Sequence, residues 1–405
     1  MDAPADVKIK GMDKKELCMR DLKTCREEID SIDRQIIELL NKRRGVAEDI
    51  AECKLKDGKQ ISDQSREGAK LRDVHEQSRR LGLPGDFGAD VFRAIMRNTV
   101  AYERRYIVER LHHEGIKRDS SIAYLGGVGS YSHLAAVKFT DFYTGSVRME
   151  GCPSFEQVEA LVSSGNCEFG ILPIENSSSG SINQVLDVLQ GSSATFVGEV
   201  FYPIDHAVLT CGAASLESIK DIYAHPQPIE QCSRYIKDFM PNVRIHYMKA
   251  SSEAMKTVAD LHDPSCAAIA GHHAGAYYGL VPVMDNIANN THNFTRFIVI
   301  SMTPITVPEN VPAKTSISFT VQKYTPGSLI NVLNEFSSRG INLTKLSSRP
   351  SLSSGHGTWE EIFFADVQAN ISSITMQECL EKVKKETSYF KLLGCYESDE
   401  ENKTK

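Results

Sequence analysis

Residues 21–54 read DLKTCREEIDSIDRQIIELLNKRRGVAEDIAECK and predict one long amphipathic helix. Apolar side chains recur at the period of an α-helix, and no proline interrupts them. The apolar positions of this helix are Ile29, Ile32, Ile36, Leu39, Leu40, Ala47 and Ile50. A helix of this length cannot bury its apolar face within a short helical segment, so we expect a second copy of the chain to cover it.

Charged and hydroxyl side chains lie on the predicted inward faces of this helix and of two helices that follow it. Arg43 and Lys54 lie on the apolar stripe itself, three turns and about 16 Å apart. The full set is Arg26, Arg43, Lys54, Asp63, Arg66, Glu67, Thr99 and Glu103. Buried charges without partners are costly, so we expect an anionic small molecule to meet them. The alternative is that long Arg and Lys side chains reach water from a helix edge.

This constellation resembles the all-helical chorismate mutase domain of bifunctional bacterial enzymes. The resemblance implies a three-helix domain over residues 15–112 that forms an intertwined homodimer or a higher homo-oligomer. The substrate-binding positions that it implies are Arg26, Arg43, Asp63, Arg66, Glu67 and Thr99. Arg26 would reach into the partner's site, Arg43 and Arg66 would hold the carboxylates of chorismate, and two carboxylates, Asp63 and Glu67, would hold its ring hydroxyl.

Lys54 and Glu103 are the mutase residues that the resemblance implies to be catalytic, at the ether oxygen of chorismate. The Claisen rearrangement to prephenate is unimolecular, so a protein assists it by restricting the substrate and stabilising charge. The family often has Gln where Glu103 stands, and a carboxylate must be protonated before it donates a hydrogen bond. We therefore predict that mutase kcat/KM rises toward acid pH and that Glu103→Gln flattens the profile.

Residues 119–303 change character, because short β-rich runs alternate with helical patterns and predict an α/β domain. The run at 121–125 leads into Gly-Gly-Val-Gly-Ser-Tyr-Ser at 126–132 and then a helix, an arrangement that offers backbone N–H groups to an anion. Ser132 stands where a dinucleotide fingerprint has its third glycine, and no Gly-Lys-Ser/Thr of a P-loop is present.

Two further motifs are more specific: Pro-Ile-Glu-Asn-Ser-Ser-Ser-Gly at 173–180 and Asn-Phe-Thr-Arg-Phe at 293–297. With the glycine turn and Tyr-Ala-His-Pro-Gln at 223–227, they resemble prephenate dehydratase. The resemblance implies two α/β lobes with a cleft between them, and chain crossings near 202–205 and 286–293. Its implied catalytic residues are Thr295 and Glu175. Its implied substrate-binding residues are Ser132, Asn176, Ser178, Ser179, His225, Gln231 and Arg296.

The dehydratase reaction removes water and carbon dioxide from prephenate and yields phenylpyruvate, for phenylalanine biosynthesis. Aromatisation of the ring drives it, so one hydroxyl or acid at the departing hydroxide is sufficient general-acid help. Thr295 is the first candidate for that group.

The last part of the chain predicts a ferredoxin-like α+β fold. Prolines at 304, 308 and 312 predict a stiff linker over 304–313. Residues 314–397 then follow the order strand, helix, strand, strand, helix, strand.

This segment resembles an ACT domain, a module that binds amino acids, through Pro-Gly-Ser-Leu-Ile at 326–330 and Leu-Ser-Ser-Arg-Pro at 346–350. The allosteric residues that it implies are Gly327, Ser328, Leu329, Ser348, Arg349 and Pro350. Phenylalanine would bind there and inhibit the dehydratase, although Ser347 replaces a usual glutamate. The alternative is a purely structural dimerisation module.

Composition sets the remaining expectations for this chain of 405 residues. A net charge of −7 gives no reason to expect a nucleic-acid partner or a membrane partner. No apolar run reaches the roughly 18 residues of a transmembrane helix, and the polar start lacks the core of a signal peptide. Ten cysteines without a Cys-x-x-Cys pair, and an isolated His272-His273 pair, favour a reduced, cytoplasmic protein without metal.

The sequence thus predicts a bifunctional chorismate mutase/prephenate dehydratase that needs no cofactor. Two alternatives stay open. The first is the same fold with a preference for arogenate as the dehydratase substrate. The second is a catalytically inactive ligand-binding regulator, against which the presence of Thr295, Glu175 and Asn176 argues.

Overall fold

The computed structural model describes residues 21–112, 119–322, 325–351 and 360–398. It divides the chain into two compact units, one through Ile50 and one from Ala51 onward. Among the helices in these ranges, none is both long and apolar enough to span a bilayer.

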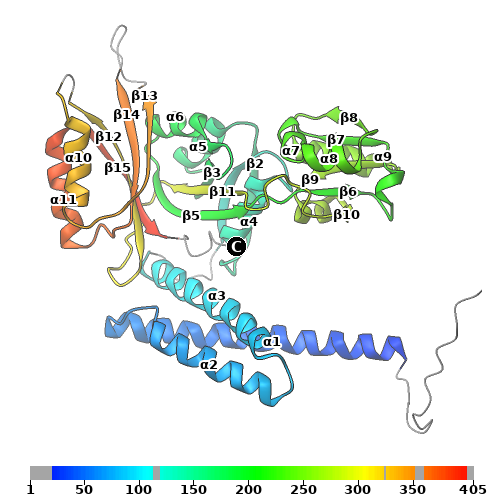
Figure 1. The fold of residues 1–405 in the computed structure, drawn as a ribbon. Coiled ribbons are helices and arrows are strands. Elements are labelled where there is room, and N and C mark those ends of the chain that lie inside the picture. The colour runs from blue at the N-terminus through cyan, green and yellow to red at the C-terminus, as the bar shows by residue number, and fades with distance from the viewer. Residues whose placement is uncertain (1–20, 113–118, 323–324, 352–359, 399–405) are drawn as a thin grey trace, which may run out of the picture. The chain divides into compact units, whose positions relative to one another are not determined.

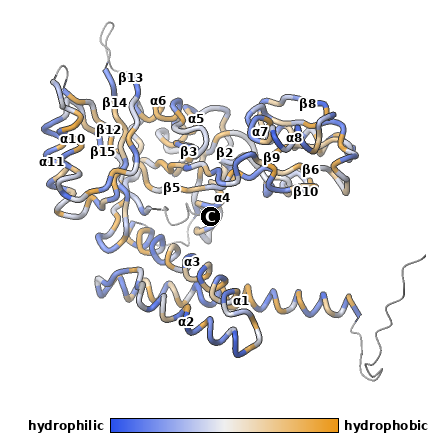
Figure 2. Tube along the Cα trace, in the orientation of Figure 1, coloured by the Kyte–Doolittle hydropathy of each residue, from blue (hydrophilic) through white to orange (hydrophobic). Residues whose placement is uncertain are grey.

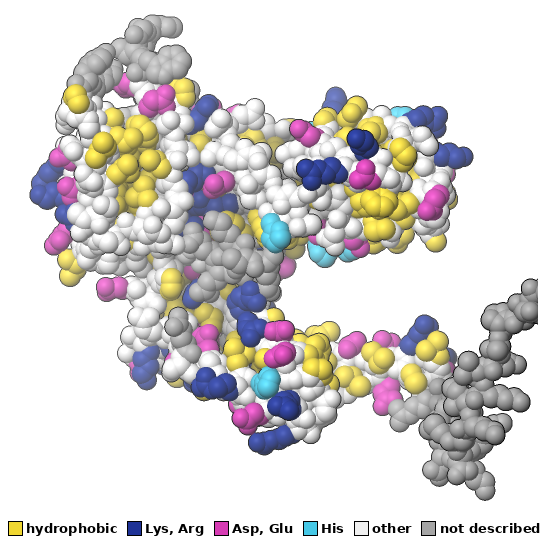
Figure 3. Space-filling model, in the orientation of Figure 1, with side chains coloured by type: hydrophobic (Ala, Val, Ile, Leu, Met, Phe, Trp, Pro, Cys, Tyr) yellow, Lys and Arg dark blue, Asp and Glu magenta, His cyan; other side chains and the backbone are white. Residues whose placement is uncertain are grey.

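Three helices form the first part of the chain, as predicted (Figure 1). They are α1 (Leu22–Asp57), α2 (Gln64–Arg80) and α3 (Gly85–His112). Along α1 the tube alternates between hydrophobic and hydrophilic colours (Figure 2), as the sequence period requires. Its apolar stripe is exposed in the single chain, since Ile29 is 57% exposed and Leu39 is 65% exposed. Figure 3 shows hydrophobic side chains at the surface along this helix.

The first lobe of the α/β region is a mixed sheet in the order β2-β1-β3-β11-β5, with β4 paired to β3. Its strands are β1 (Ser120–Leu125), β2 (Val147–Cys152), β3 (Phe169–Asn176), β4 (Gly180–Ser181), β5 (Thr195–Pro203) and β11 (Phe294–Ser301). Its helices are α4 (Tyr131–Thr140), α5 (Phe155–Ser163) and α6 (Asn183–Gly191). One core cluster packs α4 against the sheet, and a separate cluster packs α5 and α6 against it.

The second lobe is a five-stranded sheet in the order β10-β6-β9-β7-β8. Its strands are β6 (Ala207–Thr210), β7 (Asp221–Ala224), β8 (Arg244–Tyr247), β9 (Cys266–Ala270) and β10 (Val281–Met284). Its helices are α7 (Pro226–Gln231), α8 (Ser233–Phe239), α9 (Ser251–Leu261) and two 3₁₀ helices, η1 (Leu216–Ser218) and η2 (His272–Tyr278). The chain leaves the first lobe after β5 and returns in β11, which pairs with both β5 and β3.

The last part of the chain forms a four-stranded antiparallel sheet in the order β13-β14-β12-β15. Its elements are β12 (Ala313–Val321), α10 (Ser328–Ser337), β13 (Leu343–Pro350), β14 (Glu361–Val367), α11 (Ile374–Glu386) and β15 (Thr387–Glu397). This is the ferredoxin-like order, as predicted. The helices cover one face of the sheet, and the other face shares a core cluster with α6 and β5.

Two details show how tightly this sheet packs on its neighbours. A Cβ at Gly394 of β15 would lie 2.2 Å from the backbone oxygen of Phe196 in β5, so only glycine permits this approach. The segment that the sequence predicts as a linker is packed as well. Val307 and Val311 are buried in one cluster with Ile107 of α3.

Candidate active sites

Arg26 and Arg43 lie on the part of α1 that precedes Ala51. Arg26 is exposed and Arg43 is half-buried, and both share the helix with the exposed apolar stripe. Their predicted role in binding chorismate stays a prediction.

Lys54 and Glu103 form the centre of the candidate mutase site. The Lys54 Nζ lies 2.5 Å from Glu103 Oε2 and donates a second hydrogen bond to the Ile61 carbonyl oxygen at 2.5 Å. The Glu103 residue is only 4% exposed, so its carboxylate depends on this ammonium for compensation. An ammonium has three N–H donors, so one remains for a ligand after these two contacts within the described chain.

Thr99 lies one turn before Glu103 on α3 and is half-buried. Its hydroxyl donates to the Ile95 carbonyl oxygen at 2.8 Å, which is a local contact of the helix. A role of Thr99 in binding substrate stays a prediction.

The start of α2 holds three further predicted residues. Asp63 is the N-cap: its carboxylate accepts from the Arg66 N–H at 3.0 Å and from the Ser65 hydroxyl at 2.8 Å. These hydrogen bonds lower the pKa of Asp63. Glu67 accepts from the Ser62 hydroxyl at 2.9 Å, and the Arg66 side chain is exposed. Asp63 therefore has a structural role in addition to the predicted contact with the substrate.

The candidate dehydratase site forms where β3 ends beside the start of β11. Thr295 and Asn176 are partners in the antiparallel register, and both are buried. The Asn176 Nδ2 donates to the Thr295 hydroxyl oxygen at 3.0 Å and to Asn293 Oδ1 at 2.8 Å. The Asn176 Oδ1 accepts from the backbone N–H groups of Ser178 and Ser179 at 2.9 and 3.0 Å. Four residues predicted from the sequence thus form one polar cluster.

Glu175 and Arg296 adjoin Asn176 and Thr295 in sequence but lie on the opposite face of the sheet, because successive side chains of a strand alternate. Arg296 is 5% exposed, and its guanidinium donates to Glu199 at 2.7 Å, to Asp366 at 2.5 Å and to Tyr396 at 2.9 Å. Burial opposes the charge on Arg296, yet Tyr396 and the two carboxylates more than compensate and raise its pKa.

This placement bears on two expectations from the sequence. The Arg296 guanidinium is occupied by the contact with the four-stranded sheet, so its geometry does not support the predicted role in binding substrate. The Glu175 carboxylate pairs with Lys345 Nζ of β13 at 3.1 Å and lies 3.8 Å from the Arg296 guanidinium. Its side chain therefore faces away from Thr295, which does not support a direct catalytic role.

The glycine turn before α4 adopts the strand–turn–helix arrangement that the sequence predicts. Gly126 and Gly129 have positive φ values of 86° and 78°, which favour glycine. Ser130 caps α4, and the Gly129 N–H donates to His133 Nδ1 at 3.2 Å. Ser132 is buried in the first turn of α4. The Gly126 N–H also donates to the Cys152 carbonyl oxygen at 2.8 Å, and the Ser130 N–H donates to the Gly127 carbonyl oxygen at 3.1 Å. The turn therefore satisfies at least three of its N–H groups within the protein, and its role in binding a carboxylate stays a prediction.

Gln231 of the second lobe is held by a histidine that the sequence reasoning missed. The His206 Nε2 lies 2.7 Å from Gln231 Oε1, and its Nδ1 lies 3.1 Å from the Tyr131 hydroxyl. Tyr131 also donates to the Asp205 carbonyl oxygen at 2.5 Å. His206 is 1% exposed, and burial lowers its pKa, so it is neutral at physiological pH. This chain of contacts links α4 to α7 through the crossing between the lobes.

His225 was predicted from the sequence as a substrate-binding residue, whereas Asn293 was not. His225 is the N-cap of α7, where its Nδ1 accepts from the Gln227 N–H at 3.2 Å. That contact is structural and leaves Nε2 for a ligand. Asn293 was missed, although it begins the Asn-Phe-Thr-Arg-Phe motif. The position of Asn293 at the start of this motif was the feature of the sequence that could have identified it.

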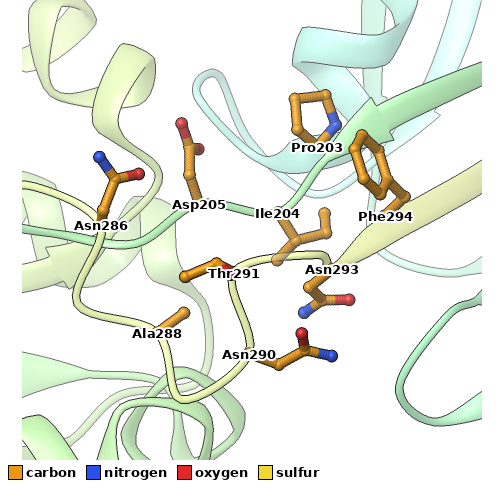
Figure 4. Close-up of a pocket in the computed structure, with 9 residues that line it drawn as sticks. All are labelled: Pro203, Ile204, Asp205, Asn286, Ala288, Asn290, Thr291, Asn293 and Phe294. Carbon is orange, nitrogen blue, oxygen red and sulfur yellow. The ribbon is translucent and has the colours of Figure 1, made fainter. Parts of the chain in front are cut away.

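A cavity of about 160 Å³ lies where the two crossing segments meet. Its lining comes from both segments (Figure 4), and the lining residues are Pro203, Ile204, Asp205, Asn286, Ala288, Asn290, Thr291, Asn293 and Phe294. It is smaller than a typical ligand pocket of roughly 300–1,000 Å³. The cavity therefore marks the crossing between the lobes, next to the Asn176 cluster, and does not by itself enclose a substrate.

The predicted allosteric residues lie on α10 and β13. Gly327 has a φ of 83° and is the N-cap of α10, which begins with Ser328 and Leu329. On β13 the side chains alternate, so that Arg349 pairs with Asp187 of α6 at 2.6 Å. The remaining two predicted residues, Ser348 and Pro350, are exposed. The geometry therefore does not support a direct contact of Arg349 with an effector.

Comparisons with known proteins identify the two parts of the chain that carry these candidate sites. A family model described as "Chorismate mutase type II" matches residues 25–104, and one described as "Prephenate dehydratase" matches residues 122–304. A bifunctional chorismate mutase/prephenate dehydratase from Buchnera aphidicola subsp. Acyrthosiphon pisum (strain APS) is 35% identical over 374 residues, which cover 92% of this chain and 96% of that protein.

Solved structures share the fold of the part after the helices. The prephenate dehydratase from Staphylococcus aureus subsp. aureus Mu50 superposes with a TM-score of 0.58 at 26% identity, covering 68% of this chain and 99% of that one. The prephenate dehydratase from Arthrobacter aurescens in complex with L-Phe superposes with a TM-score of 0.62 at 22% identity, covering 69% and 90%.

The fold and the two sites define a two-enzyme chain, with a helical mutase region followed by a two-lobed dehydratase region. The chain belongs to the family of bifunctional chorismate mutase/prephenate dehydratases.

Proposed function

We propose that this protein converts chorismate to prephenate and then prephenate to phenylpyruvate, for phenylalanine biosynthesis. The single observation that carries the proposal is that one chain contains two separate polar centres. The Lys54–Glu103 pair lies among helices, and the Thr295–Asn176 pair lies at the ends of β3 and β11. The match to a bifunctional relative over 92% of this chain supports both activities.

At the mutase centre, Lys54 stabilises the negative charge that develops on the ether oxygen as the C–O bond breaks. Its remaining N–H donates to this oxygen in the transition state. Glu103 and the Ile61 carbonyl oxygen hold the ammonium in the position that this hydrogen bond requires. Arg43 and Arg66 hold the two carboxylates of the substrate in the reactive conformation. No covalent intermediate or proton transfer is needed.

At the dehydratase centre, Thr295 assists the departure of hydroxide from the ring of prephenate. The Asn176 Nδ2 donates to the Thr295 oxygen, so the Thr295 O–H is directed away from Asn176 and is available as a donor. The C–O bond and the bond to the ring carboxylate break together. The electrons of the second bond make the ring aromatic and carbon dioxide leaves. The departing hydroxide becomes water by taking up one proton through the Thr295 hydroxyl, which regains its proton from solvent.

The active oligomer in this proposal is a homodimer that covers the exposed stripe of α1. Ile29, Ile32 and Ile36 are each about half exposed in the single chain. Burying them favours association by roughly 25 cal/mol per Å² of apolar surface. In the dimer Arg26 acts in the site of the partner subunit. An Ile36→Glu variant should be monomeric in sedimentation and should lose mutase activity, and a dimeric, active variant would contradict this part.

Phenylalanine acts as the feedback inhibitor in this proposal, at the ACT-type sheet formed by residues 314–397. The glycine N-cap at Gly327 and the exposed Ser348 are the residues that support an effector site. Because Ser347 lacks the charge of the usual glutamate and bonds Ser181 at 3.1 Å, we expect inhibition only at high phenylalanine concentration. Unchanged dehydratase activity in millimolar phenylalanine would contradict the inhibition.

We also infer a cytoplasmic location. The nine cysteines within the described residues are all free, and a reducing compartment keeps them so.

One experiment tests the two activities together. Purified protein is supplied with chorismate, and prephenate and phenylpyruvate are measured against time. Both products should form in that order. Dehydration of arogenate in preference to prephenate would favour the alternative substrate, and absence of both products would indicate an inactive regulator.

A further inference from the structure

Strand β13 contacts the dehydratase lobe through every second side chain. Lys345, Ser347 and Arg349 face the lobe and pair with Glu175, Ser181 and Asp187, in that order. These three partners lie on β3, β4 and α6. The strand therefore runs along the edge of the catalytic lobe, with one polar contact for every second residue.

Lys345 differs from the other two because its partner adjoins the catalytic residues. Glu175 immediately precedes Asn176 on β3, and Arg296 immediately follows Thr295 on β11. Glu175 and Arg296 are themselves register partners, and their side chains approach to 3.8 Å. The Lys345–Glu175–Arg296 group is thus one residue away, on each strand, from the Asn176–Thr295 hydrogen bond.

The group continues into a buried set of charges shared by the two sheets. Arg296 pairs with Glu199 of β5 and with Asp366 of β14. Lys345 lies opposite Asp366 in the pairing of β13 with β14. The Lys345 side chain is 7% exposed, and burial lowers its pKa while Glu175 opposes that shift. A lysine in such a site is held charged by its partner, so removing either one alters the whole group.

We propose that Lys345, on the four-stranded sheet, is a positioning residue for the dehydratase reaction, because its ion pair with Glu175 fixes the strand ends that carry Asn176 and Thr295. The proposal rests on the proposed dehydratase function. It assigns Glu175 a role behind the site, which explains why this residue of the motif faces away from Thr295.

The consequence of losing the Lys345 charge follows from the geometry. The Glu175 carboxylate, now 3.8 Å from the Arg296 guanidinium, is then free to approach it. There Glu175 would compete with Asp366 for the same guanidinium nitrogen. Any shift of β3 against β11 changes the 3.0 Å contact between Asn176 and the Thr295 oxygen, and so the direction of the Thr295 O–H. A misplacement of about 1 Å costs roughly a hundredfold in rate, so a partial shift should cost about tenfold.

The test compares kcat and KM for prephenate in the full-length protein and in Lys345→Gln. We expect kcat to fall about tenfold while KM changes less than about twofold, because Lys345 does not touch the substrate. Mutase activity of the same samples should be unchanged, which shows that the helical part is folded and that the loss is confined to the dehydratase reaction. Lys345→Arg should recover most of the lost kcat, since arginine also reaches Glu175 with a positive charge.

Lys391→Gln is the matched control. Lys391 of β15 also joins the four-stranded sheet to the dehydratase lobe, by donating to the carbonyl oxygen of Ser192, the residue after α6, and its described contacts do not include Glu175. This variant should keep both activities.

A Lys345→Gln variant with wild-type dehydratase kcat overturns the proposal, and so does a loss shared equally by Lys391→Gln or by the mutase activity. If the wild-type protein itself fails to convert prephenate, the proposed dehydratase function fails instead.

Discussion

Replacing Arg296 by Met is a direct test of the buried ion cluster between the dehydratase lobe and the four-stranded sheet. Arg296 and Lys314 make the direct ion pairs with Glu199 and Asp366 that the structure describes, and Arg296 is the one that contacts both carboxylates. Without it Glu199 keeps Lys314 at 2.9 Å, whereas among the described side chains Asp366 keeps the Ser316 hydroxyl at 2.6 Å and no direct ion pair. One buried carboxylate then loses its direct ion pair.

Removing one partner of a buried ion pair lowers the free energy of unfolding by about 3–5 kcal/mol, and we expect a loss of this size. For a folding unit of this size, each kcal/mol lowers Tm by roughly 2–4 °C, so we expect a fall of about 10 °C in the transition of this region. Calorimetry of the full-length protein measures it. Retention of mutase activity below the transition checks that the helical part remains folded.

The pH dependence of this variant has a definite sign. In the wild type, burial favours the neutral form of Asp366, but Arg296 and the Ser316 hydroxyl outweigh it and lower the pKa. Asp366 therefore contributes stability above its unfolded pKa, and this contribution is lost only as the pH falls through the lower folded value. In Arg296→Met, burial dominates and raises the pKa of Asp366. The variant should therefore be more strongly destabilised at pH 8 than at pH 5.

The double variant Arg296→Met with Asp366→Asn serves as the control. It removes the orphaned charge, so its Tm should lie above that of Arg296→Met at pH 8. A Tm for Arg296→Met within about 2 °C of the wild type, or a double variant with a lower Tm than the single one, would refute the reasoning about buried charge.

Two further predictions concern other parts of the chain. The Glu103 Oε2 accepts from Lys54, so Glu103 must be protonated on its other oxygen before it donates to the ether oxygen. Mutase kcat/KM should therefore rise toward acid pH, and Glu103→Gln should flatten that profile; a flat wild-type profile from about pH 5 to 8 would rule out this role. Cys232 is fully buried, and burial raises its pKa to about 12, so native protein at pH 8 should leave it unlabelled by a thiol reagent while the exposed Cys53 reacts. Peptide mapping by mass spectrometry measures the labelling, and rapid modification of Cys232 would contradict the expected burial.

Local periodicity and short motifs were sufficient to predict much of this protein. The stripe on α1 follows from helical spacing alone, and the ferredoxin-like order follows from the succession of strand and helix patterns. The Thr295 and Asn176 positions followed from motifs. The register of β11 with β3 then placed the two side chains in contact, which no pattern within either strand encodes.

The direction of Arg296 could not be read from its motif, although the alternation of side chains along a strand was a usable signal. Once Thr295 is assigned to the site, Arg296 must face the other side. Its partners could not be predicted in the same way, because Glu199 and Asp366 lie 97 and 70 residues away in sequence. Lys345 and Glu175 are 170 residues apart, and such pairs leave no periodic trace in either segment.

The most direct test of the central claim, that Thr295 and Asn176 form the dehydratase centre of a two-enzyme chain, is the rate of phenylpyruvate formation from prephenate by Thr295→Val. Valine keeps the shape and removes the hydroxyl, while Asn176 retains its bond to Asn293 at 2.8 Å. We predict that dehydratase kcat falls by at least about a hundredfold with mutase activity unchanged, and that Thr295→Ser keeps most of the rate. A Thr295→Val variant within about tenfold of wild-type dehydratase kcat would contradict the account.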